Sequence, residues 1–537
     1  MIENKKNKSI FNQALVLSSA GILTRFIGFL YRLPLTKLIG DEGNGIYSAG
    51  YYIYIFFLIL SSSGLPVAIS KMTSERLARN DNYNAHKIFR VSFMVSCITG
   101  FISMIIIFVF AKKFSILIKS PRSYYSILSL APTIFIVAIM SVFRGYFQGM
   151  CDTKPTAISQ IVEQVFNAMF SIILAYILIK KSVALGAAGG TAGTGIGAIF
   201  GLIILIFIYI KKRKLITENI NLNKKNKVFE SKKKILTEIF KTAVPIIIGT
   251  AIFSITNLID MHMVMLCLEK AGFNEKQSDI LYGQLTGKYV SITTFPVSIA
   301  TSIATVIIPS IASSYVLKKN SDIENKINKS IKFSIILSFP AAIGLAVLSK
   351  EILLMLFPSY PDGFQILKYG SLSIIFLSIT QVLAGILQGI NHMKVPVISS
   401  FIGAIIKIPL NYFLISNPKI NIIGAVISTT LCYTVTTLID IFFVIRFTKI
   451  KLNLKDIFLK PLLCTLIMGL LAKLNYLILN NLSNNNFISV LFSIVFSIIL
   501  YFLLLIILSV IKESDLKSIS FNKKIIFFLR SINMLKD

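Results

Sequence analysis

Residues 21–40 read "GILTRFIGFLYRLPLTKLIG", an apolar run that continues an apolar stretch before it and carries two arginines. A helix of this length can cross the hydrocarbon core of a bilayer. Arginine is costly in that core, so Arg25 and Arg32 should face a cavity, a partner or the membrane surface. The stretch therefore predicts a membrane helix with a polar, functional side.

The rest of the chain has the same character. Of its 537 residues 55% are hydrophobic, and the mean hydropathy is +0.77. Apolar runs of about 20 residues recur from end to end, whereas a membrane β-barrel would show shorter alternating segments. The net charge of +32 lies mainly in short loops between these runs, which disfavours nucleic acid as a partner. We therefore predict an all-α polytopic membrane protein.

Hydropathy and loop charge predict the number of spans and their orientation. Lys and Arg concentrate in alternate loops, above all 71–90 and 211–241, which places both termini in the cytoplasm. The loop 112–122, with four basic residues, is the exception. The fourteen expected spans are approximately 10–33, 46–70, 88–111, 124–148, 155–179, 184–210, 236–262, 287–312, 331–350, 366–390, 395–417, 421–446, 456–480 and 488–511.

An internal repeat predicts the domain organisation. The segment "GYFQGMCDTKP" at 145–155 matches "GILQGINHMKVP" at 385–396. Because matching spans have the same orientation, we expect two six-helix bundles related by a pseudo-two-fold axis along the membrane normal. The expected parts are an N-terminal bundle (1–210), a basic cytoplasmic linker (211–235), a C-terminal bundle (236–447), two additional helices (448–511) and a basic cytoplasmic tail (512–537).

Glycines and cysteines are expected to serve packing. Gly189, Gly193, Gly197 and Gly201 recur every four residues and form a smooth stripe for close helix contact. The five cysteines show no C-x-x-C spacing, and the three histidines are scattered. No catalytic or nucleotide-binding motif is visible. We expect no enzyme activity, no cofactor and no metal site.

Polar residues within the spans are candidates for a site. Ser159, Gln160, Glu163 and Asn167 fall on one helical face, which predicts either a wet cavity or a hydrogen-bonded helix seam. Asp260 is expected to bind an ion or to form a latch with Arg32, and Glu163 is a second candidate for ion binding. Lys288 lies at the mouth of its span, and Asp440 is expected to form a cytoplasmic salt bridge. Lys407 and Lys473 could snorkel to the membrane surface, but their depth within the spans makes this less easy.

The segments at 21–52, at 64–75 ("GLPVAISKMTSE") and at 143–164 ("FRGYFQGMCDTKPTAISQIVEQ") carry a family resemblance. The chain resembles the polysaccharide-flippase family of the multidrug/oligosaccharidyl-lipid/polysaccharide exporter superfamily, which includes stage V sporulation protein B and the MurJ-type lipid II flippases. The resemblance implies fourteen spans and a bacterial plasma membrane location. It also implies that undecaprenyl-pyrophosphate-linked sugars, lipid II or a related glycan lipid, move to the outer leaflet by alternating access.

The resemblance also implies a binding site. In the MurJ-type relatives, arginines of the first span line a cationic cavity, and Arg25 falls on that motif. Arg32 lies close to the next family arginine, so its role stays divided between substrate and latch. The expected cavity set is Arg25, Arg32, Ser159, Gln160, Glu163, Asn167, Lys288 and Lys407. Membrane lipids are partners, a coupling cation is an open expectation, and a monomer is expected.

Two other functions compete with a flippase. A cation-coupled multidrug exporter of the same superfamily would usually have twelve spans and an acidic cavity. A membrane-embedded glycan-modifying enzyme would need an acid/base pair, which the sequence does not offer. The two extra spans and the arginines therefore favour the flippase, for cell-wall or spore-cortex peptidoglycan synthesis.

Overall fold

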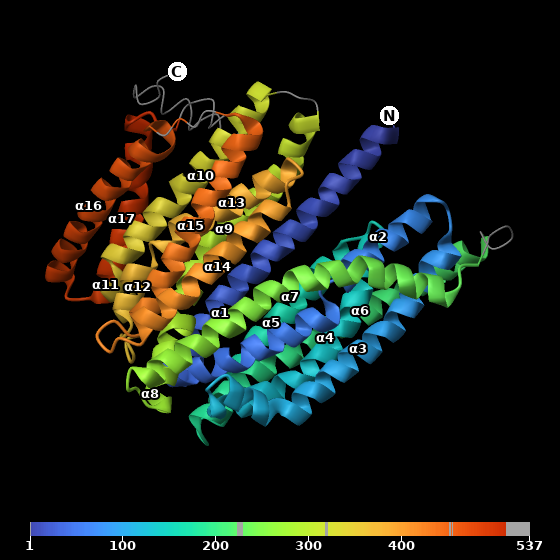
Figure 1. The fold of residues 1–537 in the computed structure, drawn as a ribbon, viewed down its shortest axis with the longest axis horizontal. Helices are drawn as coiled ribbons and strands as arrows, with labels where there is room; N and C mark the ends of the chain where they lie inside the picture. Colours follow the sequence, from blue (N-terminus) through green and yellow to red (C-terminus); the bar gives the residue numbers. More distant parts are fainter. Residues whose placement is uncertain (1, 223–228, 317–319, 451–452, 454, 512–537) are drawn as a thin grey trace. The chain divides into compact units, whose positions relative to one another are not determined.

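The computed structural model describes residues 2–222, 229–316, 320–450, 453 and 455–511, and the part of the chain within these limits is helical without a strand (Figure 1). Short 3₁₀ or π-helical turns, η1 (Pro121–Ser123), η2 (Gln284–Val290) and η3 (Lys455–Leu459), join some of the helices. The helices are α1 (Ile2–Ser62), α2 (Leu65–Ala78), α3 (Asn82–Leu117), α4 (Tyr124–Gly149), α5 (Lys154–Ile179), α6 (Val183–Leu222), α7 (Lys232–Lys270), α8 (Glu275–Gly283), α9 (Ser291–Val316), α10 (Asn320–Val347), α11 (Ser349–Leu356), α12 (Phe364–Gly370), α13 (Ser373–Gly389), α14 (Lys394–Ile415), α15 (Ile423–Thr448), α16 (Lys460–Ser483) and α17 (Asn486–Ile507).

Ten helical segments in the described part of the chain are long and apolar enough to cross a membrane, or eleven if the bent pair α12–α13 forms one span. This confirms a polytopic helical membrane protein. Each predicted span falls on a helix, although the boundaries shift. The largest shift is in α6, which continues to Leu222 where the sequence predicts the start of a linker. The count of fourteen crossings stays a prediction.

The segment quoted first belongs to an unusually long helix. α1 has 61 residues and contains a single non-helical residue, Gly40, with φ 67° and ψ −176°. Such a positive φ favours glycine, which lacks a Cβ. The chain therefore bends at Gly40 and continues as a second helical segment. The short helix α8 packs on this second segment, where Gly45 and Gly283 leave room for the backbone of the partner.

Close contacts divide the chain into two compact units, residues 1–287 and 288–537. The division thus falls after α8, whereas the sequence predicts it at the linker 211–235. The reason is that α7 and α8 pack on α1, and α7 also packs on α2 and α3. A cluster of buried side chains joins α7 to α2, α3, α4 and α6, from Leu65 of α2 to Ala243 of α7.

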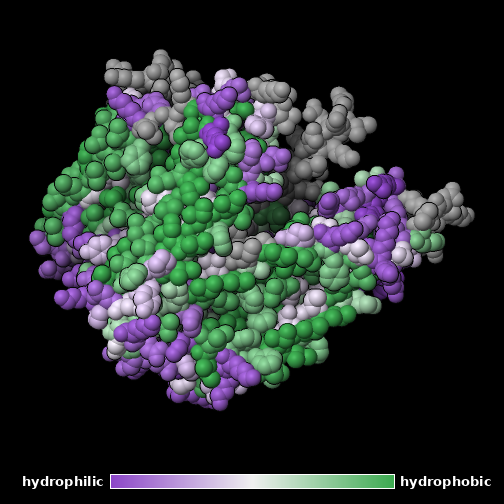
Figure 2. All heavy atoms as spheres, in the orientation of Figure 1, coloured by the Kyte–Doolittle hydropathy of each residue, from purple (hydrophilic) through white to green (hydrophobic). Residues whose placement is uncertain are grey.

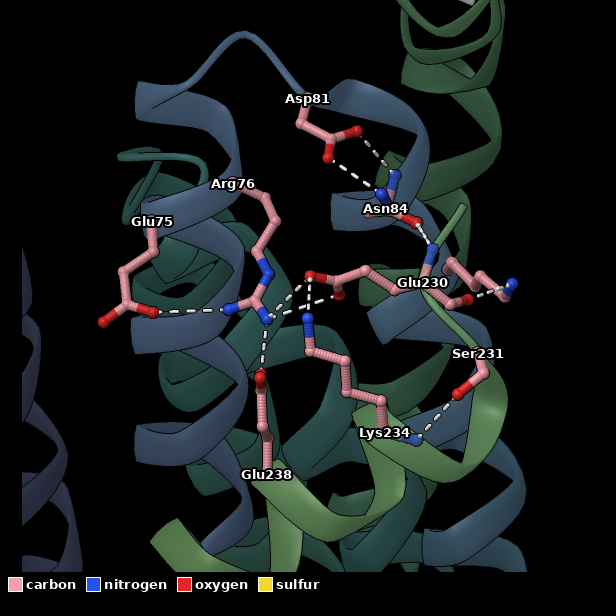
Figure 3. A network of polar contacts seen from close by, with 9 residues as sticks. Glu75, Arg76, Asp81, Asn84, Glu230, Ser231, Lys234 and Glu238 are labelled. Atoms are coloured by element: carbon pink, nitrogen blue, oxygen red, sulfur yellow. Dashed lines mark hydrogen bonds and ion pairs between the residues drawn. The ribbon is translucent and has the colours of Figure 1, made fainter. Parts of the chain in front are cut away.

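A charged network fixes the start of α7 in the first unit (Figure 3). Arg76 on α2 donates to both carboxylate oxygens of Glu230, at 3.2 and 3.3 Å, and also pairs with Glu238 on α7. Lys87 on α3 donates to the Glu230 carbonyl at 2.5 Å. Asn84 accepts from the Glu230 backbone amide at 3.2 Å. The chain entering α7 is thereby tied to both α2 and α3.

The predicted glycine stripe of α6 packs on α5. A Cβ at Gly189 would lie 2.6 Å from the Leu174 carbonyl oxygen, and one at Gly197 would lie 2.8 Å from Cβ of Asn167. Any larger residue would push the two helices apart. The stripe is therefore a packing surface, as the sequence predicts.

The repeated motif adopts the same turn in both units. Gly149 ends α4 and Gly389 ends α13, and the next helices begin at Lys154 and Lys394. Two residues after each glycine the backbone is left-handed, with φ 54° at Cys151 and 66° at Asn391. The three backbone hydrogen bonds that directly follow each glycine also correspond. The sequence match thus reflects a shared local structure.

The second unit has its own core and a large apolar exterior. Ile327, Phe339 and Leu383 belong to a buried cluster contributed by α9, α10, α13 and α15. Apolar side chains remain exposed on other faces, with Leu482 on α16 78% exposed and Phe413 on α14 72% exposed. Figure 2 shows hydrophobic residues along the visible helices and hydrophilic residues gathered near helix ends. This distribution suits a protein surrounded by lipid.

Candidate functional site

The first candidate is the guanidinium of Arg32 on α1. Its Cζ lies 4.5 Å from the ring centre of Tyr47, a cation–π contact with the second segment of the same bent helix. Its Nη1 is buried and, among the described residues, has no hydrogen-bond partner. A buried charged donor without a partner is costly, so an anion with acceptor oxygens would stabilise it. The hydrogen bonding of the Arg32 guanidinium is thus incomplete without a ligand.

Arg25 lies on the same face of α1 as Arg32, about two helical turns earlier. Its side chain is exposed. The two guanidinium groups therefore form a cationic row along α1. A diphosphate carries acceptor oxygens that match such forked donors.

Tyrosines continue from Arg32 along the second segment of α1. Tyr47 stacks on Tyr51 with 5.8 Å between ring centres, and Tyr51 lies 5.5 Å from Tyr54. This spacing places the three rings on one side of the helix. Tyr51 and Tyr54 are also electrostatic neighbours of Glu163 on α5. The tyrosines thus connect Arg32 to a second charged centre.

That second centre is an ion pair between α4 and α5. Nη2 of Arg144 lies 2.7 Å from a carboxylate oxygen of Glu163, and Nε of Arg144 donates to Ser159 at 3.1 Å. Both charged side chains are half-buried. Sequence reasoning missed Arg144, although its position inside an expected span was a usable signal. Glu163 therefore serves as the counterion of Arg144 in this structure, and its predicted role in ion binding stays a prediction.

The side chains on the polar face of α5 contact two neighbouring helices, α4 and α6. Ser159 and Asn167 are buried, and Asn167 accepts hydrogen bonds from Ser171 and from Thr194 on α6. These contacts form the helix seam, the second of the two predicted alternatives. Gln160 differs because its buried Oε1 has no hydrogen-bond partner among the described residues. Gln160 therefore remains available to a polar ligand.

The two lysines predicted for the cavity lie in the second unit. The ammonium of Lys288, 1% exposed, donates to the backbone carbonyls of Tyr360 at 2.6 Å and Asp362 at 2.9 Å. It also lies 5.6 Å from the ring centre of Phe357. These contacts favour a structural role for Lys288. Lys407 on α14 is partly buried and is an electrostatic neighbour of Tyr289.

The structure does not show the predicted latch between Arg32 and Asp260, which stays a prediction. Arg32 contacts Tyr47 in its place and, among the described residues, makes no ion pair. Asp260 on α7 is partly buried and is an electrostatic neighbour of Tyr282.

Two further expectations for charged residues also change. Asp440 is fully buried and accepts a hydrogen bond from Ser399 at 2.6 Å, in place of a salt bridge. Lys473 on α16 does not simply snorkel, because its ammonium lies 2.6 Å from the carboxylate of Glu351 on α11. Both partners come from other helices, so the spacing within one helix could not predict them.

An apolar groove of about 410 Å³ lies between α10 and α16, close to Lys473. Its other lining residues are Ile343, Val347, Leu466, Gly469, Leu470 and Leu474. Gly469 deepens the groove, since a Cβ there would lie 2.7 Å from Ile343. The groove can accept a hydrocarbon chain.

Comparison with protein families gives two matches. The family model described as polysaccharide biosynthesis protein matches residues 10–315, more than half of the chain. A second model, MatE, matches residues 286–413.

Individual proteins and solved structures agree with these matches. The chain is 29% identical to the lipid II flippase MurJ of Bacillus subtilis (strain 168), over 79% of this chain and 80% of that protein. It is 25% identical to stage V sporulation protein B of the same organism, over 82% and 85%. A solved structure of lipid II flippase MurJ, inward closed, matches with a TM-score of 0.67 at 17% identity, over 91% and 98%. An inward-facing multidrug resistance MATE family transporter matches with a TM-score of 0.66 at 14% identity, over 79% and 94%.

Proposed function

The chain belongs to the polysaccharide biosynthesis protein family, and from this premise we propose that it is a flippase for lipid-linked glycans. It moves undecaprenyl-pyrophosphate-linked sugar precursors, lipid II or a related glycan lipid, from the inner to the outer leaflet. The relatives named lipid II flippase and stage V sporulation protein support peptidoglycan of the cell wall or spore cortex as the product. The chain is a transporter and not an enzyme.

The observation that carries this proposal is the unsatisfied guanidinium of Arg32 beside the exposed Arg25. A lipid diphosphate is the anion that a membrane-embedded arginine row fits, because its oxygens replace water around each guanidinium. Gln160 offers a neutral polar group on the adjoining helix. The isoprenoid chain of such a substrate would stay in the surrounding lipid.

The finer architecture belongs to the same proposal. We propose fourteen spans, with two six-helix bundles (1–210 and 236–447) followed by two further helices, in the bacterial plasma membrane. Loop charge supports cytoplasmic termini. We propose a monomer that works by alternating access, driven by the membrane potential or a coupling cation.

Arginine variants test the proposal. In a flippase-deficient bacterium, Arg25→Ala and Arg32→Ala should each abolish rescue by the otherwise intact protein, while Lys37→Ala, an exposed cation on the same helix, should rescue fully. The direct readout is the amount of lipid II accessible at the outer leaflet, together with the level of protein in the membrane. Full rescue by both arginine variants would refute the role of the cationic row.

A cation-coupled multidrug exporter is the second candidate, and the match of residues 286–413 to the MatE model favours it. An unpaired arginine repels the cationic drugs that such exporters carry, which makes this candidate weaker. Deletion of the gene separates the two functions. Increased sensitivity to cationic drugs with normal lipid II export would support the exporter.

A further inference from the structure

A carboxyl group that is buried in the second unit makes too few hydrogen bonds to be stable in its ionised form. Asp440 on α15 is 0% exposed. Its Oδ1 lies 2.6 Å from the hydroxyl of Ser399 on α14, whereas its Oδ2 has no hydrogen-bond partner among the described residues. An ionised carboxylate with one hydrogen bond and no counterion is strongly disfavoured in such surroundings.

The hydroxyl of Ser399 shows where a proton would lie. It is within hydrogen-bond distance of two acceptors, Oδ1 of Asp440 at 2.6 Å and the carbonyl of Pro396 at 3.1 Å. A serine has one proton and can donate it fully to only one of them. If Asp440 carries a proton, it donates to Ser399, which then donates to Pro396. When Asp440 is protonated, both contacts of the Ser399 hydroxyl are hydrogen bonds. When Asp440 is ionised, the single proton of Ser399 can serve only one of the two acceptors.

α14 and α15 pack closely beside this pair, since a Cβ at Gly403 would lie 2.6 Å from the Thr436 hydroxyl. The helices packed against α15 are α10, α12, α13 and α14. Their titratable side chains, together with those of α15 itself, are Asp322, Glu324, Lys326, Lys329, Lys332, Lys368, Tyr369, Lys394, Lys407, Tyr412, Cys432, Tyr433 and Arg446.

We propose that Asp440 and Ser399 form a proton-binding site that joins α14 to α15. In the conformation described here the carboxyl group is protonated. When the helices separate and water enters, the O–H bond breaks, its electron pair stays on the carboxylate, and the proton passes to water. Any change of conformation that opens this contact therefore releases one proton, which makes the conformational equilibrium depend on pH. This site is independent of what the protein transports.

Infrared spectroscopy of the full-length protein in lipid tests the site, because a protonated carboxyl group has its own carbonyl stretching band. The wild type should show this band at about pH 5, and it should weaken towards about pH 9. Asp440→Asn should remove it, since the amide can donate to Ser399 without titrating. Glu163→Gln is the matched control, because that carboxylate is already paired with Arg144 and should not contribute.

Ser399→Ala gives a second measurement that does not require the Asn variant to fold. Loss of the acceptor should shift the Asp440 band to higher frequency. If the wild type and Asp440→Asn have the same carboxyl spectrum at every pH in this range, the proposal is overturned. An unshifted band in Ser399→Ala would overturn it equally.

Discussion

Arg144 and Glu163 form an ion pair between α4 and α5, with 2.7 Å between Nη2 and a carboxylate oxygen. Arg144→Ala leaves Glu163 half-buried without its counterion, so we expect a loss of about 1.5–3 kcal/mol in the free energy of unfolding. Thermal unfolding of the purified protein in detergent measures the loss. The double variant Arg144→Ala/Glu163→Ala should lose less than the sum of the single variants, and additive losses would contradict a direct pair.

Gly197 on α6 should not tolerate a side chain. A Cβ there would lie 2.8 Å from Cβ of Asn167, so Gly197→Ala should force α5 and α6 apart and destabilise the protein by about 1–3 kcal/mol. Gly21→Ala is the control, because nothing lies within 4 Å of a Cβ at that position. It should leave the melting temperature unchanged or raised, since alanine is the better helix former. Equal effects of the two substitutions would argue against the close packing.

Asp279 on α8, outside the candidate spans, should make stability depend on pH. Burial raises its pKa to about 7, although Arg122, at 3.6 Å, opposes the rise. The folded protein therefore holds a proton that the unfolded chain releases near pH 4. The free energy of unfolding should fall as pH rises from about 4 to about 7 and should level off above that.

Asp279→Asn isolates this contribution. The neutral amide does not titrate, so the melting temperature of the variant relative to the wild type should increase with pH across that range. Thermal unfolding at a series of pH values gives this difference directly. A constant difference between variant and wild type would mean that Asp279 keeps an ordinary pKa.

Cys151 is strained where its counterpart Asn391 is not. Both residues have a left-handed backbone in equivalent turns, and asparagine tolerates this conformation better than cysteine. Cys151→Asn should raise the free energy of unfolding by up to about 1 kcal/mol. The reverse test, Asn391→Ala, should lower stability by a similar amount. Both side chains are exposed, so a change in burial should not contribute to the difference in stability between each variant and the wild type.

The helices and the repeat of the segment between α4 and α5 could be predicted because their causes are local. Long apolar runs fix the class, and the glycine period of α6 fixes a smooth face whatever lies against it. The position in the chain at which the first compact unit ends could not be predicted in this way. It depends on Arg76, which holds Glu230 and Glu238 from a segment more than 150 residues later.

The sequence by itself determined a polytopic helical membrane protein, two matching segments and a cationic first helix, because hydropathy and helical period act between near neighbours. Only the tertiary structure decided which charged groups are paired. Arg144 meets Glu163, Lys473 meets Glu351, and Arg32 lies against Tyr47 with a donor unused. The physical reason is that the energy of a charge in an apolar interior depends on the group that another helix places beside it.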